Sequence, residues 1–117
     1  MAEYKDNYMQ HVNVWWWGKT VTLLHRQGIA TVEVQLDNDY PNTAHIKGLS
    51  VFEYKRRNGV GTELLSIAEQ IAKRYGKKYV ELSADKTKEW LVGWYQKNGY
   101  TIIHIDEHEY TMMKVLN

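Results

Sequence analysis

Apolar and polar residues alternate along the first half of the chain, as they do in half-buried β-strands. Residues 14–17, 20–25 and 29–36 are rich in β-branched and aromatic residues, and the turn-forming pairs Gly18-Lys19 and Gln27-Gly28 separate them. A stretch of turn-forming residues at 37–42, with the only proline of the sequence, precedes a fourth such segment at 43–52. The pattern predicts four strands in an antiparallel meander.

The spacing of apolar residues changes in the second half of the chain. From Val60 onward they recur at steps of three and four, and Gly76 follows the last of them, which predicts an amphipathic helix that ends at this glycine. Similar signals predict a strand at 79–84, a second helix that Asp85 or Thr87 caps and Gly99 ends, and strands at 101–105 and 110–116. Together these elements predict a single mixed α+β domain over residues 1–117.

Composition narrows the classes of function. Fifteen Lys and Arg stand against fourteen Asp and Glu, so the net charge of +1 gives no general attraction to nucleic acid or to an anionic membrane. The chain has no cysteine, no apolar run of membrane length and no signal-peptide pattern at its start, so we expect a cytoplasmic location. The five histidines never reach a zinc spacing with other ligands, and no metal is expected.

A glycine-containing segment, residues 56–62, joins the fourth predicted strand to the first predicted helix. The first backbone N–H groups of a helix have no internal partner, and the helix dipole favours negative charge beside them. Gly59 and Gly61 lack the Cβ atoms that would keep a phosphate away, and Arg56 and Arg57 add positive charge. The segment has neither the lysine of a Walker A loop nor the third glycine of a dinucleotide fingerprint. A pyrophosphate site and an ordinary turn with solvated basic residues are both consistent with it.

Two segments resemble the GNAT superfamily of N-acetyltransferases. Residues 49–61 resemble its strand-loop-helix, whose acetyl-CoA motif is Arg or Gln, two residues, Gly, one residue, and Gly or Ala. Residues 94–100, Trp-Tyr-Gln-Lys-Asn-Gly-Tyr, resemble its aromatic-Tyr-x-Lys-x-Gly-aromatic segment at the end of the second helix. The resemblance covers about residues 20–116. It implies the GNAT fold, with a mostly antiparallel mixed sheet and two main helices, and direct transfer of an acetyl group from acetyl-CoA to an amine.

The resemblance also implies how coenzyme A is held. Backbone groups of the motif strand, here at Leu49 and Val51, pair with the pantetheine arm. Lys88 stands where many members carry an asparagine, so a side-chain contact from the second helix is less expected. The loop and helix start cradle the pyrophosphate mostly through backbone N–H groups, which assigns to cofactor binding Arg56, Arg57, Asn58, Gly59, Val60, Gly61 and Thr62.

Two side chains receive catalytic roles from the resemblance. Tyr95 matches the tyrosine that protonates the departing CoA thiolate, although its place on an apolar helical face would equally suit it to packing. His45 lies about eleven residues before the motif arginine, where several members place a general base, and a structural role is its alternative. Glu81 and Asp85 are the next candidates for the base, and Asp85 could be a helix cap instead.

The sequence departs from the family near its start. Members usually carry two helices between their first two strands, whereas here only Gly18-Lys19 separates the predicted strands, so the front helices are shortened or absent. The acceptor site should then be more open, or closed by Trp15-Trp16-Trp17 or by the second subunit of a homodimer. Hairpin and core packing is the role we expect first for these tryptophans. The acceptor, a small-molecule or protein amine, is not specified by the sequence, and the alternative to catalysis is an inactive CoA-binding or protein-interaction module.

Overall fold

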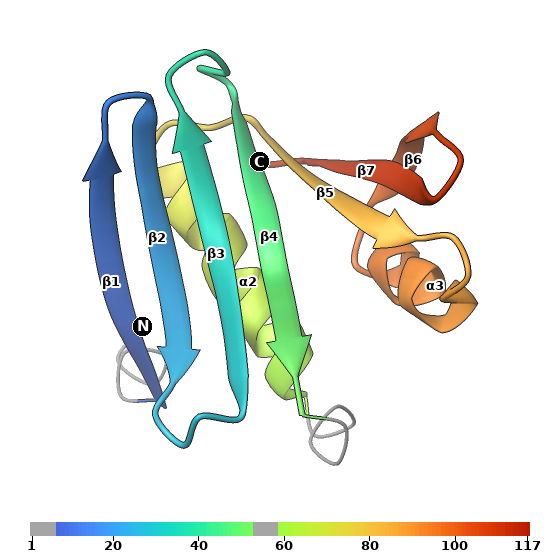
Figure 1. Ribbon diagram of the computed structural model, residues 1–117, viewed down its shortest axis with the longest axis horizontal. Coiled ribbons are helices and arrows are strands. Elements are labelled where there is room, and N and C mark those ends of the chain that lie inside the picture. The colour runs from blue at the N-terminus through green and yellow to red at the C-terminus, as the bar shows by residue number, and fades with distance from the viewer. Residues whose placement is uncertain (1–6, 53–58) are drawn as a thin grey trace.

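The computed structural model describes residues 7–52 and 59–117. Its elements follow the predicted order of four strands, helix, strand, helix and two strands (Figure 1). Their bounds are β1 Tyr8–Trp15, β2 Gly18–His25, β3 Ala30–Asp37, β4 Thr43–Val51, α2 Val60–Arg74, β5 Tyr79–Asp85, α3 Glu89–Lys97, β6 Thr101–Ile105 and β7 Glu109–Val115. The prediction of a mixed sheet with two main helices is confirmed.

The sheet is antiparallel at every neighbouring pair except β4 and β5. Its strand order is β1-β2-β3-β4-β5-β7-β6. The parallel pair β4·β5 holds for only three residues of each strand, and its last partners are His45 and Glu81. Beyond that point the two strands diverge, so the sheet opens into two parts (Figure 1). This divergence leaves one edge of the C-terminal half of β4 without a neighbouring strand in the described part of the chain.

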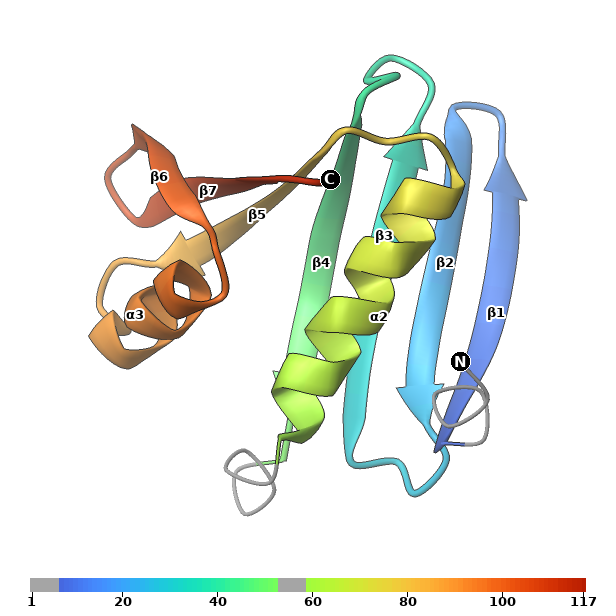
Figure 2. The ribbon, with the colours of Figure 1, turned by 180° about the vertical axis from the view of Figure 1, so that it is seen from behind.

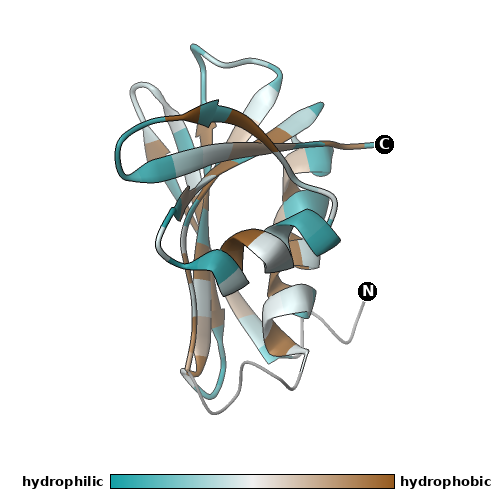
Figure 3. Cartoon of the chain, turned by 90° about the vertical axis from the view of Figure 1, so that its right-hand side faces the viewer, coloured by the Kyte–Doolittle hydropathy of each residue, from teal (hydrophilic) through white to brown (hydrophobic). Residues whose placement is uncertain are grey.

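Both main helices lie on the same face of the sheet, α2 over β2, β3 and β4 and α3 over β5 (Figures 2 and 3). Alternate strand residues point toward α2, and these are the buried ones, for example Val21, Val34 and Ile46. They pack against the apolar stripe of α2, which includes Leu64 and Ile71, as the helical periodicity predicts. No described helix covers the other face, which we call the open face, and its side chains are mostly polar.

The hairpin between β1 and β2 differs from the prediction. Trp15 pairs with Gly18, so the turn consists of Trp16 and Trp17, and the expected turn residues Gly18 and Lys19 are the first residues of β2. Strand β1 also begins at Tyr8, six residues earlier than predicted. The absence of helices between the first two strands is confirmed, because two residues connect them directly.

The three tryptophans divide between hairpin packing and exposure. The rings of Trp15 and Trp17 stack with a centroid distance of 6.3 Å and an interplanar angle of 2°. The indole N–H of Trp15 donates to the hydroxyl of Thr20 at 3.1 Å. These contacts confirm hairpin packing for two members of the cluster. Trp16 is 93% exposed at the turn, so core packing was the wrong expectation for it.

A β-bulge interrupts β4 at Gly48. Glu33 pairs with Lys47 while Thr31 pairs with Ser50, so β4 carries one extra residue between these two points. Gly48 has a φ of 59°, a left-handed conformation that glycine adopts without steric cost. The extra residue reverses which side chains face α2 in the C-terminal part of the strand.

Both helices end in the way their terminal glycines predict. After α2, Gly76 has a φ of 79°, and the N–H groups of Gly76 and Lys77 donate to the carbonyls of Lys73 and Ala72. This double hydrogen bond is a Schellman motif, which satisfies carbonyls that the helix itself leaves unpaired. Gly99 ends α3 in the same way, with a φ of 96°.

Candidate functional site

A cleft of about 800 Å³ lies between the C-terminal half of β4, the start of α2 and one side of α3. It occupies the region where β4 and β5 have diverged. Lysine and apolar side chains both line it, which suits a ligand with both phosphate and aliphatic parts. The described residues that line it are Leu49, Ser50, Val51, Gly61, Lys88, Trp90, Leu91, Gly93, Trp94 and Lys97.

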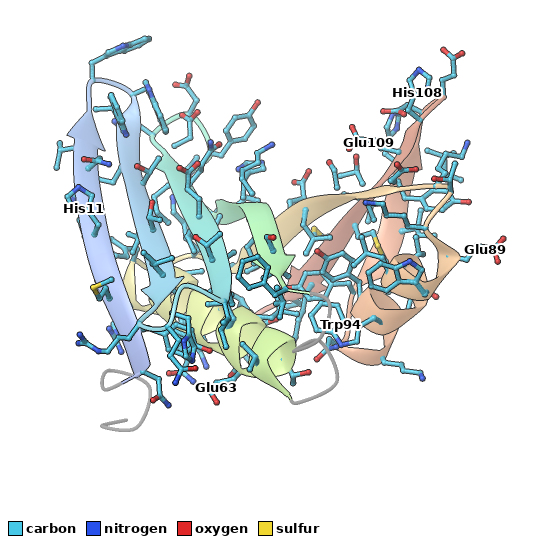
Figure 4. The ribbon with its side chains drawn as sticks, turned by 60° about the horizontal axis from the view of Figure 1, so that its bottom comes forward. His11, Glu63, Glu89, Trp94, His108 and Glu109 are labelled. Carbon is cyan, nitrogen blue, oxygen red and sulfur yellow. The ribbon has the colours of Figure 1, made fainter. Side chains whose placement is uncertain are left out.

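The start of α2 presents unpaired backbone donors at this cleft. The first helical hydrogen bond runs from the N–H of Glu63 to the carbonyl of Gly59, at 3.0 Å. The N–H groups of residues 60–62 come before it and have no acceptor among the described residues, and Gly59 caps the helix without a side-chain bond. Such amides at the positive end of a helix dipole can bind an anion, and the binding of a pyrophosphate here stays a prediction. Glu63, in the same turn, is partly buried, and its negative carboxylate partly opposes the binding of an anion (Figure 4).

The two motif glycines are needed for different reasons. Gly59 has a φ of 78°, so its backbone conformation itself favours glycine. Gly61 is helical, and a Cβ placed on it would lie 3.5 Å from the ring of Trp94 and 3.6 Å from the side chain of Val51. Those are ordinary contacts, so one methyl group fits and a branched side chain does not. The indole of Trp94 extends from α3 toward this point (Figure 4).

Leu49 and Val51 lie where the resemblance placed the pantetheine arm. Both line the cleft, and both pack against the buried core because the bulge at Gly48 turns them toward the helices. The adjacent edge of β4, from residue 46 onward, has no strand paired to it among the described residues. An extended ligand can therefore add to this edge as a strand would.

Three predicted cofactor residues, Arg56, Arg57 and Asn58, lie outside the described residues. Val60 is partly buried and Thr62 is exposed, and both belong to the first turn of α2. Their predicted contacts to a pyrophosphate stay predictions.

The aromatic ring of Tyr95 has a structural role at the end of α3. It is the third residue from the end of α3, and its carbonyl accepts a hydrogen bond from the N–H of Tyr100 at 3.1 Å. The two rings meet at a centroid distance of 5.8 Å. This is the apolar contact that accompanies a Schellman motif, so the spacing Tyr-x-Lys-x-Gly-aromatic describes a helix end.

The hydroxyl of Tyr95 is not explained by that packing. Burial raises the pKa of Tyr95 to about 12. No hydrogen bond joins its hydroxyl to any described group, and the residue is only 5% exposed. Tyr95 is not among the residues that line the cleft, although it neighbours Trp94, which is. A phenol that packs by its ring and keeps a protonated hydroxyl without a described partner has a proton to donate.

His45 lies on the open face at the point where β4 and β5 separate. Its Nε2 is 4.0 Å from a carboxylate oxygen of Glu81, and its ring meets the edge of Tyr40 at a centroid distance of 5.1 Å. Burial lowers the pKa of His45 below its usual value, outweighing the opposite effect of Glu81. The imidazole is therefore neutral at pH 7 and can accept a proton. His45 also does not line the cleft.

Asp85 is a turn residue. Its carboxylate accepts hydrogen bonds from the N–H and the hydroxyl of Thr87, at 2.9 and 2.7 Å, and these bonds lower its pKa. The sequence predicted Asp85 or Thr87 as the N-cap of α3, and this prediction is wrong. The N-cap is Lys88, whose side chain makes no capping hydrogen bond. A fully exposed carboxylate with a lowered pKa is a poor base, whereas Glu81 stays beside His45.

Sequence reasoning missed the contribution of α3 to the cleft. Trp90 and Trp94 are four residues apart, so they lie on one side of the helix, and Lys88 and Lys97 supply positive charge at the same walls. The spacing was visible in the sequence, but it equally suits core packing. In the described residues, no three His, Cys, Asp or Glu side chains gather as metal ligands, and no helix has the length and apolar character to span a membrane.

Comparison with known protein families identifies the family to which this chain is similar. A model described as the acetyltransferase (GNAT) family matches residues 3–100. A search of curated proteins found no match.

Solved structures share the fold at low sequence identity. A GNAT family acetyltransferase from Elizabethkingia anophelis with acetyl-CoA bound has a TM-score of 0.73 and 17% identity, over 96% of this chain and 100% of that chain. An IAA acetyltransferase from Bacillus cereus has a TM-score of 0.72 and 21% identity, over 98% and 82%. The paia N-acetyltransferase from Thermoplasma acidophilum in complex with coenzyme A has a TM-score of 0.71 and 22% identity, over 82% and 59%.

Proposed function

The chain belongs to the acetyltransferase (GNAT) family, and from that premise we propose that it transfers the acetyl group of acetyl-CoA directly to an amine where β4 and β5 part. One observation carries the proposal. Two surfaces suited to binding, the first amides of α2 and the edge of β4 that no described strand pairs with, meet in a single cleft. A ligand with a pyrophosphate at one end and an extended amide-containing arm would satisfy both.

The residues present fit coenzyme A part by part. The amides of residues 60–62 would hold the pyrophosphate, and the edge of β4 beside Leu49 and Val51 would pair with the amides of the pantetheine arm. Lys88 and Lys97 add positive charge for the phosphates, and Trp94 supplies an apolar wall. Two of the similar solved structures hold coenzyme A or acetyl-CoA, which supports this assignment.

The acceptor would approach from the opposite side of the sheet. Residues of α2 and α3 line the cleft, whereas His45, Lys47 and Glu81 lie on the open face. A strand rises about 3.3 Å per residue, so His45 lies roughly 13 Å from Leu49 along β4, a span that an extended arm can cover. The acyl carbon would then lie in the gap between the two strands, with the amine entering beside His45.

His45 and Tyr95 would handle the two protons of the reaction. Acetyl-CoA supplies an acetyl thioester, whose carbonyl carbon the amine attacks as the CoA thiol leaves. His45, kept neutral by its lowered pKa, would take the proton from the attacking nitrogen, directly or through water. The Tyr95 hydroxyl would donate to the departing sulfur and recover a proton from the solvent, to which His45 releases the proton that it took.

The raised pKa of Tyr95 limits how it can act. At a pKa of about 12 the hydroxyl stays protonated at neutral pH, as a donor must. A thiol has a pKa of about 8.5, so complete transfer from this phenol to a free thiolate is uphill. Tyr95 would therefore act as charge develops on the sulfur, and a water on the open side would complete the protonation.

Calorimetry with two ligands tests the cofactor site. Coenzyme A should bind, and pantetheine, which lacks the pyrophosphate, should bind far more weakly if the α2 amides provide much of the affinity. Gly61→Val should lose coenzyme A binding while circular dichroism shows an intact fold, because its branches enter the cleft between Trp94 and Val51. Gly61→Ala, whose methyl group fits, is the matched control for folding. Equal binding of both ligands, or full binding by Gly61→Val, would contradict the assignment.

A further inference from the structure

The two outer strands of the sheet, β1 and β6, are protected to very different degrees. β6 has five residues and a register shift against β7, and both features discourage pairing with another chain. β1 has eight residues paired regularly with β2 along its whole length. Its sequence, YMQHVNVW, contains no Lys, Arg, Asp, Glu, Pro or Gly, which are the residue types that usually protect an edge.

The outer edge of β1 also offers a regular set of backbone groups. Trp15 and Gly18 flank a two-residue turn, so this pair exchanges hydrogen bonds, and the N–H of Arg26 donates to the carbonyl of Asn7 at the other end of the hairpin. Paired residues alternate in an antiparallel ladder, so the odd-numbered residues of β1 bond to β2 and the even-numbered ones point their backbone groups outward. Gln10, Val12 and Val14 therefore present donors and acceptors that no described strand uses.

Exposed apolar side chains accompany this edge on both faces of the sheet. Val12 and Val14 lie on the side of α2, and Met9 and Trp15 lie on the open face, with Trp16 at the turn. A fully exposed aromatic side chain presents about 200 Å² and an aliphatic one about 100 Å². Multiplied by the exposed fractions, these areas give roughly 450 Å² of exposed apolar surface per copy. Two copies bring roughly 900 Å² before any backbone is counted, against about 1,200 Å² for a small stable interface.

We propose that the outer edge of β1 pairs antiparallel with the same edge of a second copy of this chain, so that a twofold dimer shares one continuous sheet. A twofold axis perpendicular to the sheet restricts the register, because each residue must pair with a residue of the partner whose side chain points to the same face of the sheet. With Val12 on the axis, it pairs with its own copy, and Gln10 pairs with Val14 of the partner subunit. Every outward backbone group of these residues is then bonded.

The same register matches the side chains of the open face. His11, labelled on the edge strand in Figure 4, comes opposite the partner's Asn13, and within one chain the Nε2 of His11 already lies 3.1 Å from the Oδ1 of Asn13, which accepts a hydrogen bond from it. Met9 comes opposite the partner's Trp15, a sulfur–aromatic pairing. The neighbouring register, with His11 on the axis, would instead place two imidazoles face to face and leave Val12 opposite Gln10.

Sedimentation analysis of three proteins tests the dimer. The wild type should sediment as a dimer at micromolar concentration. Val12→Lys should sediment as a monomer with an unchanged circular dichroism spectrum, because the exposed side chain is tolerated in one copy but sets two like charges together on the axis. Ile105→Lys puts the same charge on the other outer strand, at a residue that is 60% exposed, and should remain a dimer. A monomeric wild type, a dimeric Val12→Lys, or a monomeric Ile105→Lys would overturn the proposal.

Cross-linking tests the register without relying on a disruptive variant. The chain has no cysteine, so a single substitution gives an unambiguous readout. Hydrogen-bonded partners across an antiparallel pair have Cα atoms about 5.5 Å apart, within disulfide range. Val12→Cys should form a covalent dimer under mild oxidation, and Ile105→Cys should not. A covalent dimer from both variants, or from neither, would contradict the Val12 register.

Discussion

Replacing Tyr95 and Tyr100 by phenylalanine, one at a time, separates catalysis from packing at the end of α3. The two rings touch, both are buried and both belong to the same helix-end motif. They differ in what the hydroxyl does. Tyr100 donates to a carboxylate oxygen of Glu69 at 2.8 Å, and Glu69 also bonds Lys114 at 2.9 Å. The hydroxyl of Tyr95 has no described partner.

The expected effects follow from those contacts. Tyr100→Phe removes a hydrogen bond to a charged group, which is worth about 1.5–3 kcal/mol, so its melting temperature should fall by roughly 5–10 °C. Tyr95→Phe keeps the ring contact and loses no described hydrogen bond, so its stability should change by no more than about 0.5 kcal/mol. Its turnover should fall by about 10²- to 10⁴-fold if the hydroxyl is the acid. Tyr100→Phe should keep its turnover below its melting temperature.

Thermal melts and steady-state kinetics with acetyl-CoA and one amine measure both quantities. Coenzyme A affinity should be the same in the two variants, since neither hydroxyl is assigned a part in holding the cofactor before the reaction. Unchanged turnover in Tyr95→Phe, measured where chemistry limits the rate, would reduce Tyr95 to a packing residue. A large loss of stability in Tyr95→Phe would show that its hydroxyl has a structural partner.

Three further predictions concern pH and the glycines. The value of kcat/KM should rise with pH through an apparent pKa below that of an ordinary histidine, because burial lowers the pKa of His45. With the same amine, His45→Gln should be slower and should not show this rise. An identical pH profile in both proteins would remove His45 from the mechanism. The folded-state pKa of Tyr95 is raised, so its contribution to stability is complete below about pH 10 and is lost as pH rises toward 12. In urea titrations, the free energy of unfolding should therefore fall less at alkaline pH in Tyr95→Phe than in the wild type. An equal fall in both proteins would refute the argument that this phenol is buried. Gly59→Ala should destabilise the protein by about 1–2 kcal/mol because its φ is 78°, whereas Gly93→Ala, in a helix with open space around the new methyl group, should stabilise it by about 0.5–1 kcal/mol; equal effects in thermal melts would contradict the conformational argument.

Patterns with a strong local cause were predictable from the sequence. The apolar stripe from Val60 and the stop at Gly76 gave the helix to within a residue, because the stripe matches the helical period and the glycine supplies the left-handed end. Periodicity does not predict the divergence of β4 and β5. Nothing local in either strand shows where a parallel pair stops.

Other features depend on register, which a single sequence does not display. Strict alternation would place Leu49 and Val51 on the same face as His45, but the bulge at Gly48 turns them to the opposite face. The hairpin turn was assigned to Gly18-Lys19 because glycine favours turns, whereas pairing to Asp37 keeps Gly18 in β2. A Cβ on Gly18 would clash with the carbonyl of Leu36, so this glycine serves close strand packing.

The most direct test of the proposed function is product detection by mass spectrometry after incubation with acetyl-CoA and a panel of small-molecule and peptide amines. The account predicts that at least one amine gains one acetyl group while an equal amount of free coenzyme A thiol appears. Tyr95→Phe should bind acetyl-CoA normally and form this product far more slowly. Normal binding of acetyl-CoA by the wild type with no acetylated amine, across cationic small molecules and peptides alike, would contradict the claim that this cleft performs acetyl transfer.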